Sequence, residues 1–223
     1  MKNIVKGILI AAISFNVASC SSFLDLTPPD RVSDKVIWEN TQNAEYAVNF
    51  IYSYIYDLTV SQSKMGLTEA LTDQMKYGSY NYNSMCYLPS EFSYGDATTI
   101  TASYVDSYMG YWSSNYGAIR KTNQAIYELY KYGQMSEEDK VRISAELRFM
   151  RAFLYFDMVK RYKDVIIYDE NMENIVKDKA VSTEEEGWNF IQSDLEYAAA
   201  NLPDRSAAKG RLSRGAAWAM LSR

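Results

Sequence analysis

Residues 145–162 read AELRFMRAFLYFDMVKRY, and this stretch decides the fold class. Its apolar residues recur on more than one side of a helix, which predicts a central helix that is buried on several faces. Ser136 is a typical N-cap, and the acidic residues 137–139 suit the positive end of the helix dipole. We therefore expect one long helix over 136–162 in the middle of the protein.

The first half of this stretch carries Glu146, Arg148 and Arg151, and the two arginines lie one helical turn apart. These charges have a functional and a structural interpretation. We favour the structural one, in which Glu146 and Arg151 pair with neighbouring helices. In the same interpretation, the aromatic side chains of the stretch pack into the core, namely Phe149, Phe153 and Phe156.

Further helix signals lie on both sides of this stretch. A three- and four-residue repeat of apolar side chains predicts a helix from Asn40–Thr41 to about residue 58, and a shorter helix is expected over 67–75. Another helix is predicted over 102–132, with Gly133 as the C′ residue that ends it. A capping box of Thr183 and Glu186 opens a helix that stops before Pro203, and Ser213 opens the last one.

The remaining segments are a short extended piece at 165–168 and a long loop at 77–101, which lacks any sustained period. The pattern as a whole predicts an all-α fold of antiparallel helix pairs with long loops.

The first twenty residues have the layout of an export signal. Two lysines precede an uncharged apolar run, and small residues then lead to Cys20. The apolar run is shorter than the ~20 residues that span a bilayer. The tetrad Val17-Ala18-Ser19-Cys20 resembles the bacterial lipobox, so we expect residues 1–19 to be a signal peptide and Cys20 to be lipidated. Pro28-Pro29 forbids helix, which suggests that residues 20–39 form an extended lipid tether.

Composition excludes several classes of function. The chain has a net charge of −5 and no basic cluster, so nucleic acid is not an expected partner. It contains no histidine, the commonest general base and transition-metal ligand, and no metal site is expected. With Cys20 acylated, Cys86 has no partner for a disulfide. A glycan hydrolase would require paired carboxylates. The nearest candidates are Glu69 with Asp73 and the run Glu184–Glu186, and both fit solvated positions on a helix better.

The loop at 77–101 is the candidate ligand surface. Sugar recognition requires flat rings for the apolar sugar face and amides or carboxylates for the hydroxyl groups. The loop supplies these in alternation, and the candidate binding residues are Tyr80, Asn81, Tyr82, Asn83, Tyr87 and Tyr94. A loop that faces another protein, or one that is merely solvated, is the alternative.

Three stretches resemble the SusD/RagB family of outer-membrane nutrient-uptake lipoproteins. They are CSSFLDLTPP at 20–29, AELRFMRAFLYFDMVKRY at 145–162 and GRLSRGAAWAML at 210–221. One departure is local: Lys163 stands where the family usually has glycine. Family members are also longer, so the resemblance implies that residues 40–223 are an N-terminal helical domain, incomplete at its C-terminus.

The resemblance implies a tetratricopeptide-like scaffold that is lipid-anchored at the outer membrane and faces the cell surface. It implies capture of oligosaccharides or other nutrients for a TonB-dependent transporter, without enzymatic activity or a cofactor. The alternatives are a structural transporter-associated lipoprotein with no ligand of its own and, less favoured, a glycan hydrolase.

Overall fold

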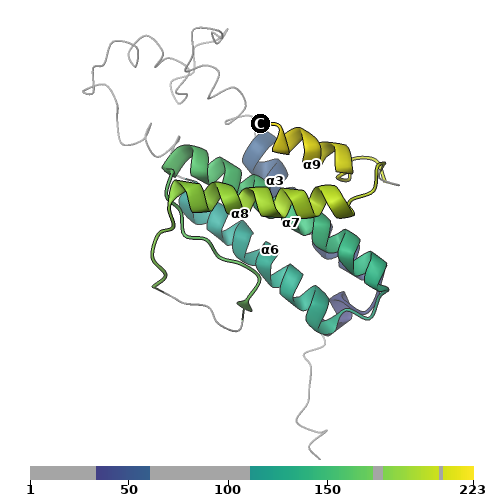
Figure 1. Cartoon of the computed structure of the whole chain (residues 1–223). Helices are drawn as coiled ribbons and strands as arrows, with labels where there is room; N and C mark the ends of the chain where they lie inside the picture. Colours follow the sequence, from purple (N-terminus) through teal and green to yellow (C-terminus); the bar gives the residue numbers. More distant parts are fainter. Residues whose placement is uncertain (1–33, 61–110, 173–177, 206–207) are drawn as a thin grey trace, which may run out of the picture. The chain divides into compact units, whose positions relative to one another are not determined.

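A computed structural model of the chain describes residues 34–60, 111–172, 178–205 and 208–223 (Figure 1). The described part is helical apart from its connections. The helices are α2 (Asp34–Ile37), α3 (Thr41–Val60), α6 (Trp112–Tyr132), α7 (Glu137–Tyr162), α8 (Glu184–Asn201) and α9 (Arg214–Leu221). The all-α prediction is confirmed.

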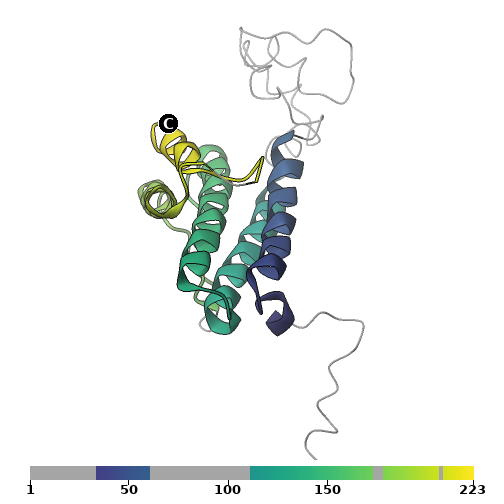
Figure 2. The same ribbon diagram turned by 90° about the vertical axis from the view of Figure 1, so that its right-hand side faces the viewer.

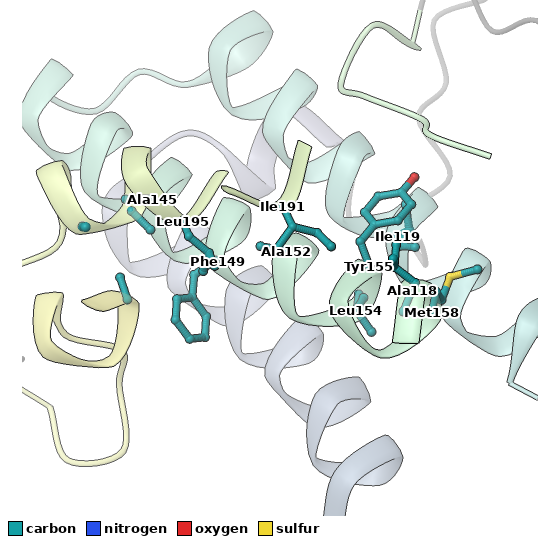
Figure 3. Packing of buried hydrophobic residues seen from close by; sticks show 14 of the residues in the cluster. Ala118, Ile119, Ala145, Phe149, Ala152, Leu154, Tyr155, Met158, Ile191 and Leu195 are labelled. Carbon is teal, nitrogen blue, oxygen red and sulfur yellow. The ribbon is translucent and has the colours of Figure 1, made fainter. Parts of the chain in front are cut away.

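Helix α7 occupies the centre, as predicted from its sequence. It contacts α3, α6 and α8, and Figure 2 shows α3 and α8 on opposite sides of it. One face of α7 packs against α2, α3 and α6 through Ile143, Leu147 and Met150. The other face packs against α6, α8 and α9, where Figure 3 shows Phe149 close to Leu195, Ala152 close to Ile191, and Tyr155 beside Ile119.

Side-chain contacts give the direction of each helix. In α7 and α8, Arg151 meets Asp194, and Val159 lies beside Gly187, so residue numbers rise along one helix as they fall along the other. Lys121 reaches Tyr54, whereas Trp38 reaches Glu128, so α3 and α6 are also antiparallel. Two antiparallel pairs, α3 with α6 and α7 with α8, therefore make up most of the described body, in agreement with the predicted architecture.

Local capping explains where α7 and α8 begin. The Ser136 hydroxyl accepts a hydrogen bond from the Asp139 amide, at 3.1 Å. The Thr183–Glu186 capping box is complete, because each side chain bonds to the other residue's backbone N–H. Both caps were predicted, and the run Glu184–Glu186 is the first turn of α8. Val165 pairs with Ser182 as an isolated antiparallel bridge, which agrees with the predicted extended piece.

The expected extended tether over 20–39 is wrong in its last residues. Residues 34–37 are helical as α2, and the indole of Trp38 is buried against α6, with 1% of the residue exposed. The Trp38 Nε1–H donates to Glu128, and the Trp38 carbonyl accepts from the Gln134 amide, at 3.0 and 3.1 Å. Burial of this large ring draws the chain into the helical body before Asn40.

Gly133 ends α6 as predicted but in a different conformation from a C′ glycine. Its φ of −61° and ψ of 124° are extended rather than left-handed, since the chain turns directly toward Trp38. The glycine is instead required by space, because a Cβ there would lie 2.2 Å from the Leu129 carbonyl oxygen.

Candidate functional site

The predicted ligand residues Tyr80, Asn81, Tyr82, Asn83, Tyr87 and Tyr94 lie outside the described residues. So do Cys20, Glu69 and Asp73 and the predicted helix at 67–75. The structure does describe the two points between which the loop segment runs, the end of α3 at Val60 and residue Tyr111 before α6. Because α3 and α6 are antiparallel, both points lie at the same end of the helical body.

Aromatic side chains gather at this end. The ring of Trp112 makes edge-to-face contacts with Tyr116 at 4.9 Å and with Tyr162 at 5.0 Å between centroids. The backbone N–H of Tyr111 donates to the Tyr162 hydroxyl, at 3.2 Å. These contacts join the start of α6 to the end of α7.

Two tyrosine hydroxyls hold the extended piece at 165–168 in place. The Tyr116 hydroxyl accepts from the amide of Ile166 at 2.6 Å and donates to the carbonyl of the same residue at 3.0 Å. The Tyr155 hydroxyl likewise accepts from the amide of Tyr168, at 2.7 Å. Burial raises the pKa of Tyr116 to about 12, so this hydroxyl keeps its proton and its double role at neutral pH.

The charges of the central stretch form a buried network, in agreement with the structural interpretation. The Arg151 side chain is 1% exposed and makes a two-point contact with Asp194, through Nε at 2.7 Å and Nη2 at 2.8 Å. Its Nη1 donates to the side chains of Asn123 and Glu170, at 2.7 and 2.6 Å. A single guanidinium therefore connects α6, α7, α8 and the segment after α7.

Glu146 is the centre of a second, smaller network. Its carboxylate accepts from Tyr52 of α3 at 2.9 Å, from Arg142 at 3.1 Å and from Arg211 before α9 at 2.9 Å. The Tyr52 hydroxyl also accepts from the amide of Leu212, at 3.0 Å. The predicted pairing of Glu146 with neighbouring elements is confirmed, as is the burial of Phe149 and the packing of Phe153 and Phe156.

A pocket of about 310 Å³ opens beside the Arg151 network. It is lined by Arg148, Arg151, Asp169, Glu170, Asn171, Phe190, Ser193 and Asp194. Burial alone would raise the pKa of Glu170, but the positive charge of Arg151 and its hydrogen bond outweigh burial and lower that pKa below its ordinary value. Glu170 therefore stays ionised at neutral pH, whereas burial raises the pKa of Asp194 despite its contact with Arg151.

Sequence reasoning did not find Asn123, Glu170 and Asp194 as the partners of Arg151. They lie 28, 19 and 43 residues away along the chain, and no spacing pattern relates them. In the part of the chain that the structure describes, no three acidic, cysteine or histidine side chains are grouped so that they could hold a metal ion. Among the described helices, none combines the length and the apolar character that crossing a membrane requires.

Comparison with known proteins now adds to this geometry. Residues 22–223 match a SusD-like family model described as starch-binding and associating with the outer membrane. The chain belongs to the SusD-like family. This result confirms the resemblance drawn from the sequence and accounts for the all-α body of antiparallel pairs.

Individual relatives give the extent of the similarity. A SusD-like protein of Bacteroides ovatus is 29% identical over 98% of this chain and 38% of its own length. A crystal structure of a SusD-like protein from Bacteroides fragilis superposes with a TM-score of 0.66 at 27% identity, over 89% of this chain and 37% of that one. A structure with a xylogluco-oligosaccharide superposes with a TM-score of 0.60 at 28% identity, over 80% of this chain and 33% of that one. The SusD-like chain thus spans less than half the length of the relatives it matches.

Proposed function

We propose that this SusD-like chain contributes to an outer-membrane lipoprotein that binds glycans and delivers them to a TonB-dependent transporter. The observation that carries the proposal is the family match over residues 22–223, to proteins described as starch-binding and outer-membrane-associated. A similar structure holding a xylogluco-oligosaccharide supports a neutral glycan as the ligand class. The proposed role is binding, and no step of it is catalytic.

The proposed ligand surface is the tyrosine- and asparagine-rich loop with Tyr80, Asn81, Tyr82, Asn83, Tyr87 and Tyr94. Alternating rings and amides suit a sugar, whose ring faces are apolar and whose edges carry hydroxyl groups.

The loop is tested by affinity gel electrophoresis of the full chain, purified in detergent, through gels that contain starch or xyloglucan. We expect retardation of the wild type, and at least tenfold weaker binding when Tyr80, Tyr82, Tyr87 and Tyr94 are all replaced by alanine. The matched control replaces Tyr130 and Trp218, which are exposed on α6 and α9. Undiminished binding by the loop variant would remove the loop as the site.

The structural alternative is tested through the transporter. A protein that only supports its transporter would co-purify with a large outer-membrane barrel and would bind neither polysaccharide. Binding of glycan together with co-purification agrees with the proposed function, whereas new reducing ends in the polysaccharide would point to the hydrolase instead.

A further inference from the structure

The outward face of α3 has an unusual composition. Its described exposed residues are Gln42, Tyr46, Asn49, Phe50, Ser53 and Tyr56, which we name the α3 strip. No member of the strip is charged, but two charged residues border it: the Glu45 side chain is 38% exposed on the same helix, and Lys121 of α6 lies over the Phe50 ring. Three of its six members are aromatic, and Tyr46, Phe50 and Tyr56 are 63%, 53% and 62% exposed.

The strip is a continuous surface because its members recur at helical spacing. Residues three and four apart lie on the same face of a helix, and four residues rise by about 6 Å. Tyr46 and Phe50 are thus neighbours on the face, with the amide of Asn49 beside them. Figure 2 shows α3 at the outer edge of the helical body, with α7 and α6 on its inner side only.

Neighbouring residues fix part of the strip in place. Gln42 donates to the Tyr46 hydroxyl at 3.4 Å, and Phe50 makes an edge-to-face contact with Tyr54 at 5.1 Å. Lys121 of α6 lies over the rings of Phe50 and Tyr54, at 4.8 and 4.7 Å from their centroids. Rings that are held in one orientation lose little freedom when they bind a flat partner.

The chemistry of the strip selects its partner. A membrane-surface helix would carry lysine or arginine beside aliphatic residues, and the strip carries neither. The charges beside the strip, Glu45 and Lys121, have opposite signs, and Glu45 is paired with Arg142, so the strip presents no field of one sign to a charged partner. Exposed rings interleaved with amide and hydroxyl groups match a neutral sugar chain, with its apolar ring faces and hydroxyl edges.

We infer that the α3 strip is a second contact surface for a neutral glycan, additional to the loop at 77–101. The inference rests on the proposed glycan-binding function and deepens it, since it assigns described residues and a charge class to the ligand. The strip leads along α3 toward Val60, after which the segment that contains the candidate loop begins.

The test uses the full chain in detergent and gels that contain starch, xyloglucan or the acidic polymer polygalacturonate. The strip variant combines Tyr46→Ala, Phe50→Ala and Tyr56→Ala, and the control combines Tyr130→Ala with Trp218→Ala, which are 48% and 59% exposed elsewhere on the body. The strip variant lacks the two or three rings that would stack on the sugar, so it should bind the neutral polymer about tenfold more weakly than the wild type. The control should bind like the wild type, and far-ultraviolet circular dichroism should be the same for all three.

Each other outcome overturns the inference in a recognisable way. If the strip variant binds as the wild type does while the loop variant fails, the proposed function stands and the strip is not a glycan surface. If the strip variant keeps glycan binding but loses its co-purifying transporter, the strip is a protein interface. If the wild type is retarded by neither neutral polymer, the proposed function fails and the inference falls with it.

Discussion

At the residue scale, two positions differ from what local rules prefer, and the structure gives the reason for each. Lys163 has a φ of 61° and a ψ of −79°, and the amide of Asp164 donates to the carbonyl of Tyr162 at 2.9 Å. This is a γ-turn with a side chain in a region that favours glycine. Gly187 lies in α8 against Val159 of α7, so it has a helical backbone and no space for a side chain.

Replacing Lys163 by glycine should stabilise the protein. Glycine removes the strain of a positive φ, worth about 1–3 kcal/mol, while the more flexible unfolded chain offsets part of that gain. We expect the free energy of unfolding to rise by about 1 kcal/mol, measured by urea denaturation. Lys163→Ala is the control, because it retains the Cβ and should give no gain. Equal stabilities of the two variants would show that the turn is not strained.

Replacing Gly187 by alanine should destabilise the protein, because the new Cβ would lie 2.9 Å from Cγ2 of Val159. Overpacking of this kind costs about 1–3 kcal/mol, which outweighs the better helix propensity of alanine. Gly117 is the matched control. It lies within α6 with nothing within 4 Å of its Cβ position, so Gly117→Ala should stabilise by about 0.5–1 kcal/mol. Thermal unfolding should lower the midpoint temperature of Gly187→Ala and raise that of Gly117→Ala. A shift of both midpoints in the same direction would contradict this account.

At the element scale, α7 determines how the other helices are placed. Its two apolar faces separate the helical body into two clusters, one toward α3 and one toward α8. Hydrophobic packing is non-directional, so it does not by itself select one register of α8 against α7. The two-point contact of Arg151 with Asp194 is directional, and it fixes that register while Glu170 attaches the connecting segment.

Replacing Arg151 by alanine should destabilise the protein by about 3–5 kcal/mol, because buried Asp194 would lose its two-point contact and keep only Arg148, at 3.7 Å, as a cation partner. The side chain of Asp194 is 2% exposed and cannot recover its hydration. Chemical denaturation should also give a smaller loss for the double variant Arg151→Met/Asp194→Leu, which buries no unpaired charge. Asp204→Asn, which breaks an exposed ion pair with Arg214, is the control and should change stability by less than about 1 kcal/mol. A loss for Arg151→Ala no larger than that control would mean that the network does not organise the helices.

At the scale of the whole molecule, the proposed function depends on how the chain is held at the membrane. The helical body begins at α2, fourteen residues after Cys20. A fully extended chain of that length spans at most about 50 Å, so a lipid on Cys20 would keep the body within that distance of the bilayer. Stable anchoring requires more than one acyl chain, which is what the lipobox resemblance implies for this cysteine.

Labelling with a palmitate analogue tests the anchor. The wild type should incorporate the label and remain in the membrane fraction, and Cys20→Ser should lose both properties. Cys86→Ser is the control, because the sequence gives it no part in lipidation. Equal labelling of wild type and Cys20→Ser would place the anchor elsewhere and remove the membrane part of the proposal.

Much of the fold follows from the sequence because it depends on interactions within a few residues. The caps at Ser136 and Thr183 and the central position of α7 were all predicted, since a cap bonds within one turn and a helix exposes its apolar faces in its own repeat. The family resemblance also followed from short stretches of sequence, which the match over residues 22–223 confirms. The Tyr-rich loop stays a prediction, as does the lipid on Cys20.

Only the tertiary structure decided the partners of these elements. Trp38 is buried where its indole N–H donates to Glu128 of α6. No residue near Trp38 in the sequence indicates this contact. The partners of Arg151 come from three other segments. The strip on α3 can be identified only from the tertiary structure, which shows that the opposite face of the helix packs against α6 and α7. Helix caps and apolar periodicity depend on residues that are close in sequence, so the sequence alone predicts them. Ion-pair partners and the exposure of a helix face depend on which distant segments meet in space.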